Sequence, residues 1–278
     1  PYPVTVKGNE ILMNESRFPI YAEKDPARLP WQELGVDVVL ECTGLFTKRD
    51  LAAKHVDAGA KRVIISAPSP TADVTIVPGV NDHQFDPGKH QVISLASCTT
   101  NSLAPPLKVL HDNFGVEHVM VTTVHAYTVS QALVDGPAKK QRRGRAAAVS
   151  LIPTTTGAAV ATTQVLPELE GRMDAIAIRA PVLDGAITDI VAHLRQECSV
   201  GKVNAAFKAA ADGPLNGILG YSEEELVSAD ILGDPHSGIV DALSTRVVQG
   251  HVVKVLVWYD NEFGYARRLL DIFVRLPL

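Results

Sequence analysis

The chain has 278 residues, which is long enough for two domains. Its 21% charged and 46% hydrophobic residues are typical of a globular protein, and a net charge of −5 gives no reason to expect nucleic acid or an acidic membrane as a partner. No stretch approaches the roughly 18 consecutive apolar residues of a membrane span. The N-terminus has neither the basic start nor the apolar core of a secretory signal.

Cysteine and histidine spacing argues against disulfides and metal sites. The three cysteines, Cys42, Cys98 and Cys198, contain no CxxC pair, and the nine histidines show no HExxH or other ligand spacing. An odd number of unclustered cysteines makes a disulfide framework or a thiolate zinc site improbable. We therefore expect a cytoplasmic protein without a metal.

The first part of the chain is predicted to consist mainly of strands. Short paired strands are expected at residues 4–6 and 10–13 around a hairpin turn, followed by a strand at 18–21. Residues 36–40 then form a continuous apolar run, which is typical of a parallel strand that is covered on both faces.

The next elements alternate in a way that indicates a parallel sheet. A helix is expected at residues 48–58, and strand-like stretches follow at 62–66, 74–77 and 91–95. Such βαβ units predict a Rossmann-type, doubly wound dinucleotide-binding domain. Its usual Gly-rich turn, GxGxxG, occurs nowhere in the chain. Either the sheet is of another kind, or its first half precedes residue 1.

The second half is predicted to be an α+β domain with an antiparallel sheet and a closing helix. An irregular basic loop is expected at residues 127–144. The expected helices are at 102–114 (continuing from the cysteine at 98), 158–166, 203–211 and 265–274. The expected strands are at 116–124, 173–179, 186–193, 225–231, 239–243 and 252–259, of which the second and third alternate as antiparallel strands.

Cys98 lies between a predicted strand and a predicted helix. Free amides at the start of a helix stabilise a thiolate, so we expect the pKa of this thiol to be lowered. His125, about one strand further on, could take its proton. A buried inert thiol and a core histidine are the commoner outcomes for such residues taken singly, and Cys42 keeps that interpretation, as does Cys198.

Six motifs occur in one order along the chain. They are SCTTN at residues 97–101, then TTVHAYT, RRGRAAA, IPTTTGAA, IRAPV and WYDNEFGY. Together they closely resemble the glyceraldehyde-3-phosphate dehydrogenase family, from about residue 20 to residue 272. The resemblance implies a glycolytic, phosphorylating oxidoreductase that is cytoplasmic and homotetrameric and uses NAD, with NADP not excluded. Family members begin with a strand and an NGFGRIGR-type loop, so we expect this chain to lack the N-terminal dinucleotide-binding segment.

The resemblance implies roles for the central residues. Cys98 matches the nucleophile that attacks the aldehyde to give a thiohemiacetal. His125 matches the base that assists hydride departure, and it stabilises the oxyanion together with the Cys98 amide. Inorganic phosphate would then attack the acyl thioester to yield an acyl phosphate.

The same resemblance implies two phosphate pockets and a cofactor site. The substrate-phosphate pocket matches Thr128 and Arg179. The inorganic-phosphate pocket matches Ser97, Thr99, Arg143, Thr156 and Gly157. Hydroxyls, a helix-opening amide and guanidinium forks suit phosphate. The cofactor positions are Thr43, Gly44 and Ser66 on the adenosine and ribose side, with Asn261 and Tyr265 near the nicotinamide. The pair at 43–44 could equally be a plain strand-end turn.

Some positions depart from the family pattern. Ser102 replaces a second cysteine that is not the nucleophile, so activity should be unaffected. Residues 180–185 depart from RVPTxNxS directly after Arg179, which could slightly alter the substrate-phosphate pocket. The acidic residue that selects NAD over NADP falls in the expected missing segment, and Pro137 weakly favours NAD.

The sequence thus predicts oxidation and phosphorylation of glyceraldehyde 3-phosphate to 1,3-bisphosphoglycerate. The alternatives are an erythrose-4-phosphate dehydrogenase, which HAYT and PTTTG favour less, or a truncated member without dehydrogenase activity. We expect a partial dinucleotide-binding domain at residues 1–97, a catalytic domain at 98–264, and a C-terminal helix at 265–278 that packs back on the first domain.

Overall fold

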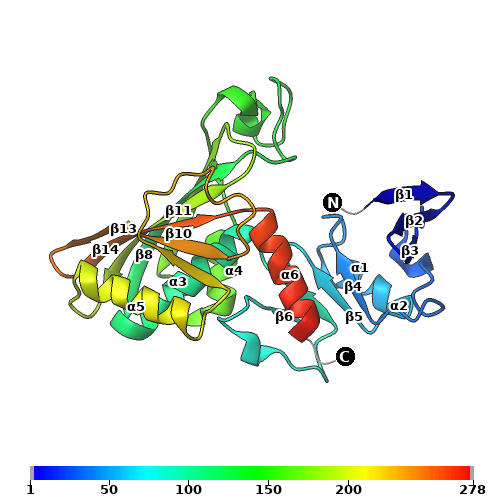
Figure 1. The fold of residues 1–278 in the computed structure, drawn as a ribbon, viewed down its shortest axis with the longest axis horizontal. Coiled ribbons are helices and arrows are strands. Elements are labelled where there is room, and N and C mark those ends of the chain that lie inside the picture. The colour runs from blue at the N-terminus through cyan, green and yellow to red at the C-terminus, as the bar shows by residue number, and fades with distance from the viewer. Residues whose placement is uncertain (1–2, 276–278) are drawn as a thin grey trace.

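The computed structural model describes residues 3–275 and contains three separate sheets (Figure 1). The first strands, β1 (Val4–Lys7), β2 (Glu10–Met13) and β3 (Ser16–Pro19), form a small antiparallel meander at one end of the molecule. The expected hairpin around Lys7–Glu10 is confirmed by the pairing of Val4 with Met13. The strand expected at 18–21 lies two residues earlier than predicted.

The second sheet is parallel and has the order β4-β5-β7-β6. Its strands are β4 (Val38–Glu41), β5 (Arg62–Ile65), β7 (Val92–Ser94) and β6 (Val74–Thr75). All four were expected from apolar runs, which are required because both faces of the sheet are covered. The expected helix at 48–58 divides into α1 (Arg49–Ala52) and α2 (Lys54–Asp57).

Two apolar clusters cover the faces of the parallel sheet. On one face, Ile64 and Ile93 pack with Leu269 and Ile272 of the last helix, α6 (Phe263–Arg275). On the other face, the strands pack against Ala52 of α1. The end of the chain therefore returns to the sheet formed by its early part, and α6 lies between the two halves of the molecule in Figure 1.

The third sheet has seven strands in the order β12-β13-β14-β11-β8-β10-β9. They are β12 (Leu219–Ser222), β13 (Gly238–Val248), β14 (Val252–Tyr259), β11 (Ala186–Leu194), β8 (Val116–Ala126), β10 (Met173–Ala180) and β9 (Ile152–Thr155). The expected antiparallel sheet is mixed, because β10 runs parallel to β8 and β12 runs parallel to β13. β8 lies between β10 and β11, and the long connection from β8 through β9 permits the parallel crossover.

The predicted strand at residues 225–231 was wrong, and β9 and β12 were not predicted. Residues 225–227 have no regular structure and 228–231 form a turn, and the Val227 amide donates to Asp230 Oδ2 at 2.8 Å. A side-chain acceptor so close in sequence competes with the ladder partner that a strand would need.

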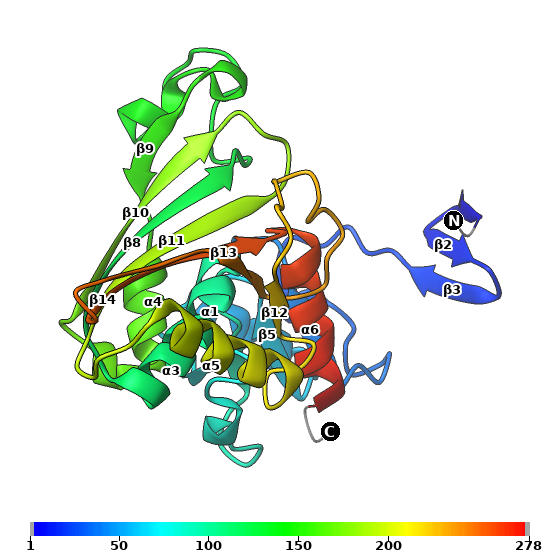
Figure 2. The ribbon, with the colours of Figure 1, turned by 60° about the vertical axis from the view of Figure 1, so that its left-hand side comes forward.

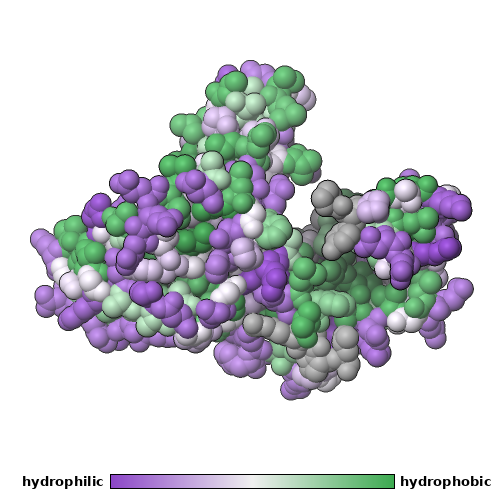
Figure 3. All heavy atoms as spheres, in the orientation of Figure 1, coloured by the Kyte–Doolittle hydropathy of each residue, from purple (hydrophilic) through white to green (hydrophobic). Residues whose placement is uncertain are grey.

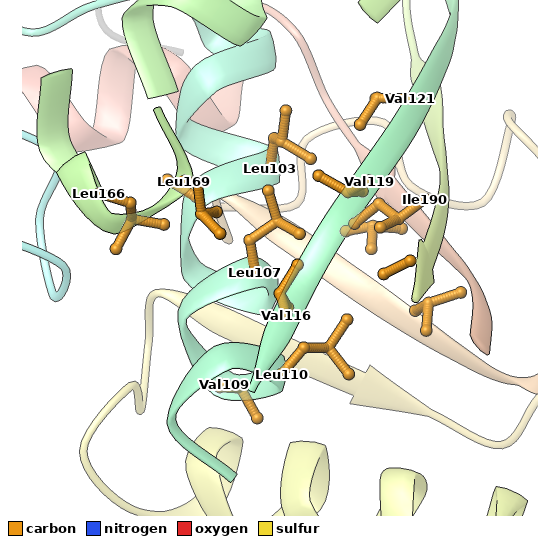
Figure 4. Packing of buried hydrophobic residues seen from close by; sticks show 14 of the residues in the cluster. Leu103, Leu107, Val109, Leu110, Val116, Val119, Val121, Leu166, Leu169 and Ile190 are labelled. Atoms are coloured by element: carbon orange, nitrogen blue, oxygen red, sulfur yellow. The ribbon is translucent and has the colours of Figure 1, made fainter. Parts of the chain in front are cut away.

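The main core forms where α3 (Cys98–Phe114) packs on the third sheet. Leu103 and Leu107 of α3 lie against Val119 of β8 and Ile190 of β11, all essentially buried (Figure 4). α4 (Ala158–Val165) and α5 (Val200–Asp212) add side chains to the same cluster. Burial of this size fixes the axis of α3, and therefore the position of its first residue, Cys98.

The basic loop between β8 and β9 projects from the body of the protein (Figure 2). It contains two short 3₁₀ turns, at Gln141–Gly144 and Ala147–Val149. Backbone hydrogen bonds tie the loop together, for example from the Gly136 amide to the Gly144 carbonyl at 2.8 Å. A β-carbon at Gly144 would lie 2.2 Å from the Gly136 carbonyl oxygen, so this crossing requires glycine.

Within residues 3–275, no helix combines the length and the apolar character needed to cross a membrane.

Candidate active site

Cys98 is the first residue of α3 and follows a tight turn from β7. Ala96 in this turn has a φ of 54°, a left-handed conformation that is unusual for a residue with a β-carbon. The Tyr265 hydroxyl donates to the Ala96 carbonyl at 3.0 Å and holds the turn from α6. Ser97 caps the helix by accepting from the Thr100 amide at 3.1 Å. Both ends of the turn are thus fixed before the chain reaches the thiol.

His125 reaches the thiol from β8. Its Nε2 lies 3.5 Å from Cys98 Sγ, and its Nδ1 lies 2.7 Å from the Ala126 carbonyl oxygen. In the neutral tautomer with the hydrogen on Nδ1, this nitrogen donates to the Ala126 carbonyl. In that tautomer the Nε2 lone pair faces the thiol. This is the arrangement of a general base beside a nucleophile.

Arg179 is brought beside His125 by strand register. The parallel pairing of β10 with β8 places Arg179 opposite His125. Nη1 of Arg179 donates to the Ala126 carbonyl at 2.8 Å and lies 2.9 Å from His125 Nδ1, to which it donates only in the tautomer with the hydrogen on Nε2. In the other tautomer the Ala126 carbonyl accepts from both side chains, so in either tautomer the ring and the guanidinium are linked.

Burial decides the charge state of the pair. It lowers the pKa of His125 to about 4, assisted by the positive charge of Arg179. It also raises the pKa of the Cys98 thiol, against the opposing pull of hydrogen bonds from Thr99 and of the Arg179 charge. The expected lowering of the thiol pKa was wrong, because desolvation outweighs the helix-terminal amides. At rest the pair is a neutral thiol beside a neutral imidazole.

The cationic groups near the pair are poised for an anion. Burial, and then the charge of Arg143, lowers the pKa of Arg179, and Arg179 Nε is buried without a hydrogen-bond partner. Arg143 donates to neutral oxygens of Ser130 and Thr154 at 2.9 and 3.0 Å. Among the described residues, neither guanidinium forms an ion pair with a carboxylate. Two unneutralised cations with a free donor suit a phosphate ester.

Ser130 connects the two expected phosphate pockets, although it was not predicted. Its hydroxyl lies 3.1 Å from the Thr128 hydroxyl and accepts from Arg143 Nη1. Thr128 was assigned to one pocket and Arg143 to the other, so the loop links one residue of each set through Ser130. The only available signal was the position of Ser130 two residues after Thr128.

The other expected phosphate residues are partly engaged within the protein. Ser97 serves as the helix cap, and the Thr99 hydroxyl lies 3.0 Å from the Tyr259 hydroxyl. Thr156 accepts from the Ala158 amide at 3.2 Å, and Gly157 is the exposed N-cap residue that precedes α4. Residues 97–99 lie at the start of α3, and residues 156–157 lie just before the start of α4. These two helices contact each other.

Tyr259 is the buried residue that sequence reasoning missed. Its hydroxyl lies 2.8 Å from the Thr123 hydroxyl and 3.0 Å from that of Thr99, so it links β8 to α3. Its ring packs edge-on against His125, with centroids 5.9 Å apart. Burial raises the pKa of this phenol well above its ordinary value, so the hydroxyl stays protonated. The motif WYDNEFGY contained the signal, because Tyr259 immediately precedes the Asp-Asn pair.

The expected cofactor residues lie where parallel sheets bind ligands. Thr43 and Gly44 follow β4 after one intervening residue, and Ser66 directly follows β5, so all three lie at the carboxyl edge of the sheet. Asn261 Oδ1 accepts from the Gly185 amide at 3.1 Å, which fixes its side-chain amide. Tyr265 contacts the turn before Cys98. The expected cofactor residues therefore come from the carboxyl edge of the parallel sheet and from the segment around the start of α6.

Comparisons with known proteins decide the family. A sequence model of the glyceraldehyde 3-phosphate dehydrogenase C-terminal domain matches residues 97–261. The glyceraldehyde-3-phosphate dehydrogenase of Geobacillus stearothermophilus is 55% identical over 269 residues, which cover 97% of this chain and 80% of that protein. The chain belongs to the glyceraldehyde-3-phosphate dehydrogenase family. The resemblance drawn from the motifs is confirmed.

Other members of the glyceraldehyde-3-phosphate dehydrogenase family match over a similar range. Glyceraldehyde-3-phosphate dehydrogenase 1 of Bacillus subtilis strain 168 is 54% identical over 97% of this chain and 80% of its own length. The Streptomyces coelicolor enzyme is 53% identical over 98% of this chain and 79% of its own length. The model of the family's NAD binding domain matches residues 1–49. The expectation that the N-terminal dinucleotide-binding segment is lacking is therefore not supported.

The fold class expected for a glyceraldehyde-3-phosphate dehydrogenase is also confirmed. A parallel, Rossmann-type sheet is followed by an α+β half with a largely antiparallel sheet and a C-terminal helix. Among the residues that the structure describes, no group of three or more His, Cys, Asp or Glu side chains could hold a metal ion.

Proposed function

We propose that this chain oxidises and phosphorylates glyceraldehyde 3-phosphate to 1,3-bisphosphoglycerate, with NAD as the cofactor. The observation that carries the proposal is the 3.5 Å approach of Cys98 Sγ to His125 Nε2, with Arg179 opposite His125 in the sheet. The names of the similar bacterial proteins and the NAD binding domain match support the same activity.

The neutral pair begins the reaction by proton transfer. His125 Nε2 takes the thiol proton as Cys98 Sγ forms a bond to the aldehyde carbon, and the carbonyl electrons move onto oxygen. The Cys98 amide, free at the start of α3, stabilises that oxyanion. His125 returns the proton to the oxygen, which completes the thiohemiacetal. His125 is then ready to take the hydroxyl proton when the carbon is oxidised.

The remaining residues position the two phosphates and the cofactor. Thr128 and Arg179 hold the substrate phosphate, and inorganic phosphate binds at Ser97, Thr99, Arg143, Thr156 and Gly157. Inorganic phosphate attacks the thioester carbon, the C–S bond breaks, and the acyl phosphate departs. Cys98 is left as a thiolate, and His125 returns to it the proton that it took from the hydroxyl. When bound, NAD supplies the acceptor for the hydride. Its adenosine and ribose side would be held by Thr43, Gly44 and Ser66, and its nicotinamide side by Asn261 and Tyr265.

We also propose the domain division 1–97, 98–264 and 265–278. The parallel sheet ends with β7 at Ser94, and the seven-stranded sheet ends at Tyr259, which supports these limits. Packing of Leu269 and Ile272 on the parallel sheet supports a returning C-terminal helix.

A homotetramer in the cytoplasm completes the proposal. The outer face of the seven-stranded sheet exposes Met120, Ile176 and Val191 on three adjacent strands. The projecting loop also carries exposed apolar side chains, visible as green patches on the upper protrusion in Figure 3. Both surfaces suit contacts between copies of the chain. Three free cysteines support a reducing compartment.

The test compares aldehydes and acceptors in one assay. Formation of the reduced cofactor is followed by its absorbance with glyceraldehyde 3-phosphate or erythrose 4-phosphate, with and without inorganic phosphate, and with NAD or NADP. We expect fast, phosphate-dependent reduction of NAD with the triose. A marked preference for erythrose 4-phosphate would assign the alternative dehydrogenase, and reduction with neither aldehyde would reject dehydrogenase activity.

A further inference from the structure

A chain of buried and part-buried hydrogen bonds ends at the turn after β4. Trp31 Nε1 donates to His55 Nδ1 at 3.0 Å, and His55 Nε2 lies 3.1 Å from Glu41 Oε2. The other oxygen, Oε1, accepts from the Thr43 amide at 2.8 Å and from the Thr43 hydroxyl. We propose that Trp31, His55 and Glu41 are positioning residues that preset the Thr43–Gly44 turn for the ribose side of a dinucleotide. The ligand class rests on the proposed function.

We call the hydrogen-bonded side chains of Trp31, His55 and Glu41 the relay. The hydrogen atoms in its bonds can be placed in one consistent way. An indole nitrogen can only donate, so His55 Nδ1 must accept from Trp31. The neutral ring then carries its hydrogen on Nε2 and donates it to Glu41. The directions of the two bonds from Trp31 through His55 to Glu41 follow from the indole, which cannot accept, and the two Thr43 groups donate to Glu41 from the other side.

The relay is buried where a broken bond is costly. Glu41 is 3% exposed and His55 is 5% exposed. The carboxylate of Glu41 receives its donors from His55 and from both polar groups of Thr43, which satisfies its two oxygens. Loss of a donor would leave a buried carboxylate oxygen without a partner, so the carboxylate or the turn would have to move.

The turn that the relay holds is open on its outer side. Gly44 has a φ of 72°, and a β-carbon there would meet no atom within 4 Å. The Thr43 hydroxyl donates to Glu41 and accepts from the Leu45 amide at 3.1 Å, so it is used inside the turn. What the turn offers a ligand is therefore its backbone shape. The Ser66 amide donates to the Glu41 carbonyl at 3.0 Å, which ties the adjacent strand end to the same residue.

The relay also connects separate elements of the first domain. Trp31 lies in the segment before β4, and His55 lies on α2, which covers the sheet. The shape of the sheet edge thus depends on an element packed behind it, and not only on the sequence of the turn.

The test measures the turn and the ligand separately. In the chain of residues 1–278, amide hydrogen exchange at residues 43–45 and the dissociation constant for NAD by titration are compared for wild type, His55→Phe and His55→Gln. Phenylalanine fills the space of the ring without a donor or acceptor. The glutamine side chain keeps a carbonyl oxygen that accepts from Trp31 and an amide group that donates to Glu41. His90→Phe is the matched control, because His90 accepts from the Asp86 amide elsewhere in the same domain.

We expect His55→Phe to speed exchange at residues 43–45 and to weaken NAD binding by about tenfold each, with exchange in β5 and β7 unchanged. His55→Gln should restore most of both, and His90→Phe should alter neither. Unchanged exchange at 43–45 in His55→Phe overturns the relay. Faster exchange with unaltered NAD affinity overturns its role in binding. Failure of the wild type to bind NAD rejects the proposed function, while exchange still decides the relay.

Discussion

The reacting pair and the cofactor edge are built in different ways. Cys98, His125 and Arg179 are fixed by a helix axis and by sheet register, within or beside the main core. Thr43 and Gly44 are exposed turn residues that hydrogen bonds hold at the end of a strand. Packing allows few alternative positions, whereas a turn can shift when one bond is lost. Substitutions in the first region should therefore reduce the chemical step, and those in the second should weaken cofactor binding.

The largest expected effect is at the nucleophile. Cys98→Ala should lower kcat by on the order of 10⁴-fold or more, because no other group can form the thioester. Thermal unfolding should change little, since the residue begins a helix whose core contacts remain. Cys42→Ala is the matched control and should keep full activity in the same assay. Comparable losses in both variants would contradict the assignment.

The second-largest effect is expected at the general base, His125. His125→Gln should lower kcat by roughly 10²- to 10⁴-fold, because the thiol loses the group that takes its proton. The KM for the aldehyde should change much less. His118→Gln, on the same strand, provides the control. A variant that keeps wild-type kcat would show that another group removes the proton.

The same histidine should make the protein sensitive to acid. The unfolded chain binds this proton near pH 6.5 and the folded chain only near pH 4, so the free energy of unfolding should fall by about 3 kcal/mol as pH drops through that window. Urea unfolding between pH 4 and pH 7 measures this slope. In His125→Gln the part due to this group should vanish, and an identical slope in both proteins would refute the lowered pKa.

A smaller loss is expected at the substrate phosphate. Arg179→Lys keeps the charge but removes the fork, and should raise the KM for the aldehyde by about 10- to 100-fold. Arg142→Lys, an exposed position in the basic loop, should leave KM unchanged. Equal effects of the two substitutions in steady-state kinetics would speak against a specific phosphate contact.

The smallest change is expected on the cofactor side. Asn261→Ala removes the amide held by Gly185 and should raise the KM for NAD by about tenfold, with a smaller change in kcat. Steady-state kinetics at varied NAD measure both. A loss confined to kcat would contradict the claim that substitutions on the cofactor side mainly weaken cofactor binding.

The sequence predicted the elements and motifs better than their mutual positions. The apolar runs of β4, β5 and β7 and the start of α3 could be predicted because local pattern determines them. The pairing of Arg179 with His125 could not, because it depends on β10 running parallel to β8 across a long connection. No sequence rule specifies that register.

The sequence also failed to predict the protonation of the thiol and some of the hydrogen-bond partners in the site. The helix start predicted a low thiol pKa for Cys98, but burial by distant segments raised it. Tyr259 and Ser130 were overlooked because their importance arises from contacts with residues such as Thr99 and Arg143, far apart in sequence. Local chemistry can be predicted from a motif, whereas desolvation is a property of the folded chain.

The most direct test is to identify the acylated residue. The protein is mixed with glyceraldehyde 3-phosphate and NAD without inorganic phosphate, quenched in acid, digested and analysed by mass spectrometry. We predict one phosphoglyceroyl group on the peptide that contains Cys98, lost when phosphate is added before the quench. Acylation at Cys42 or Cys198 instead, or no acylated peptide while NADH is formed, would contradict the account.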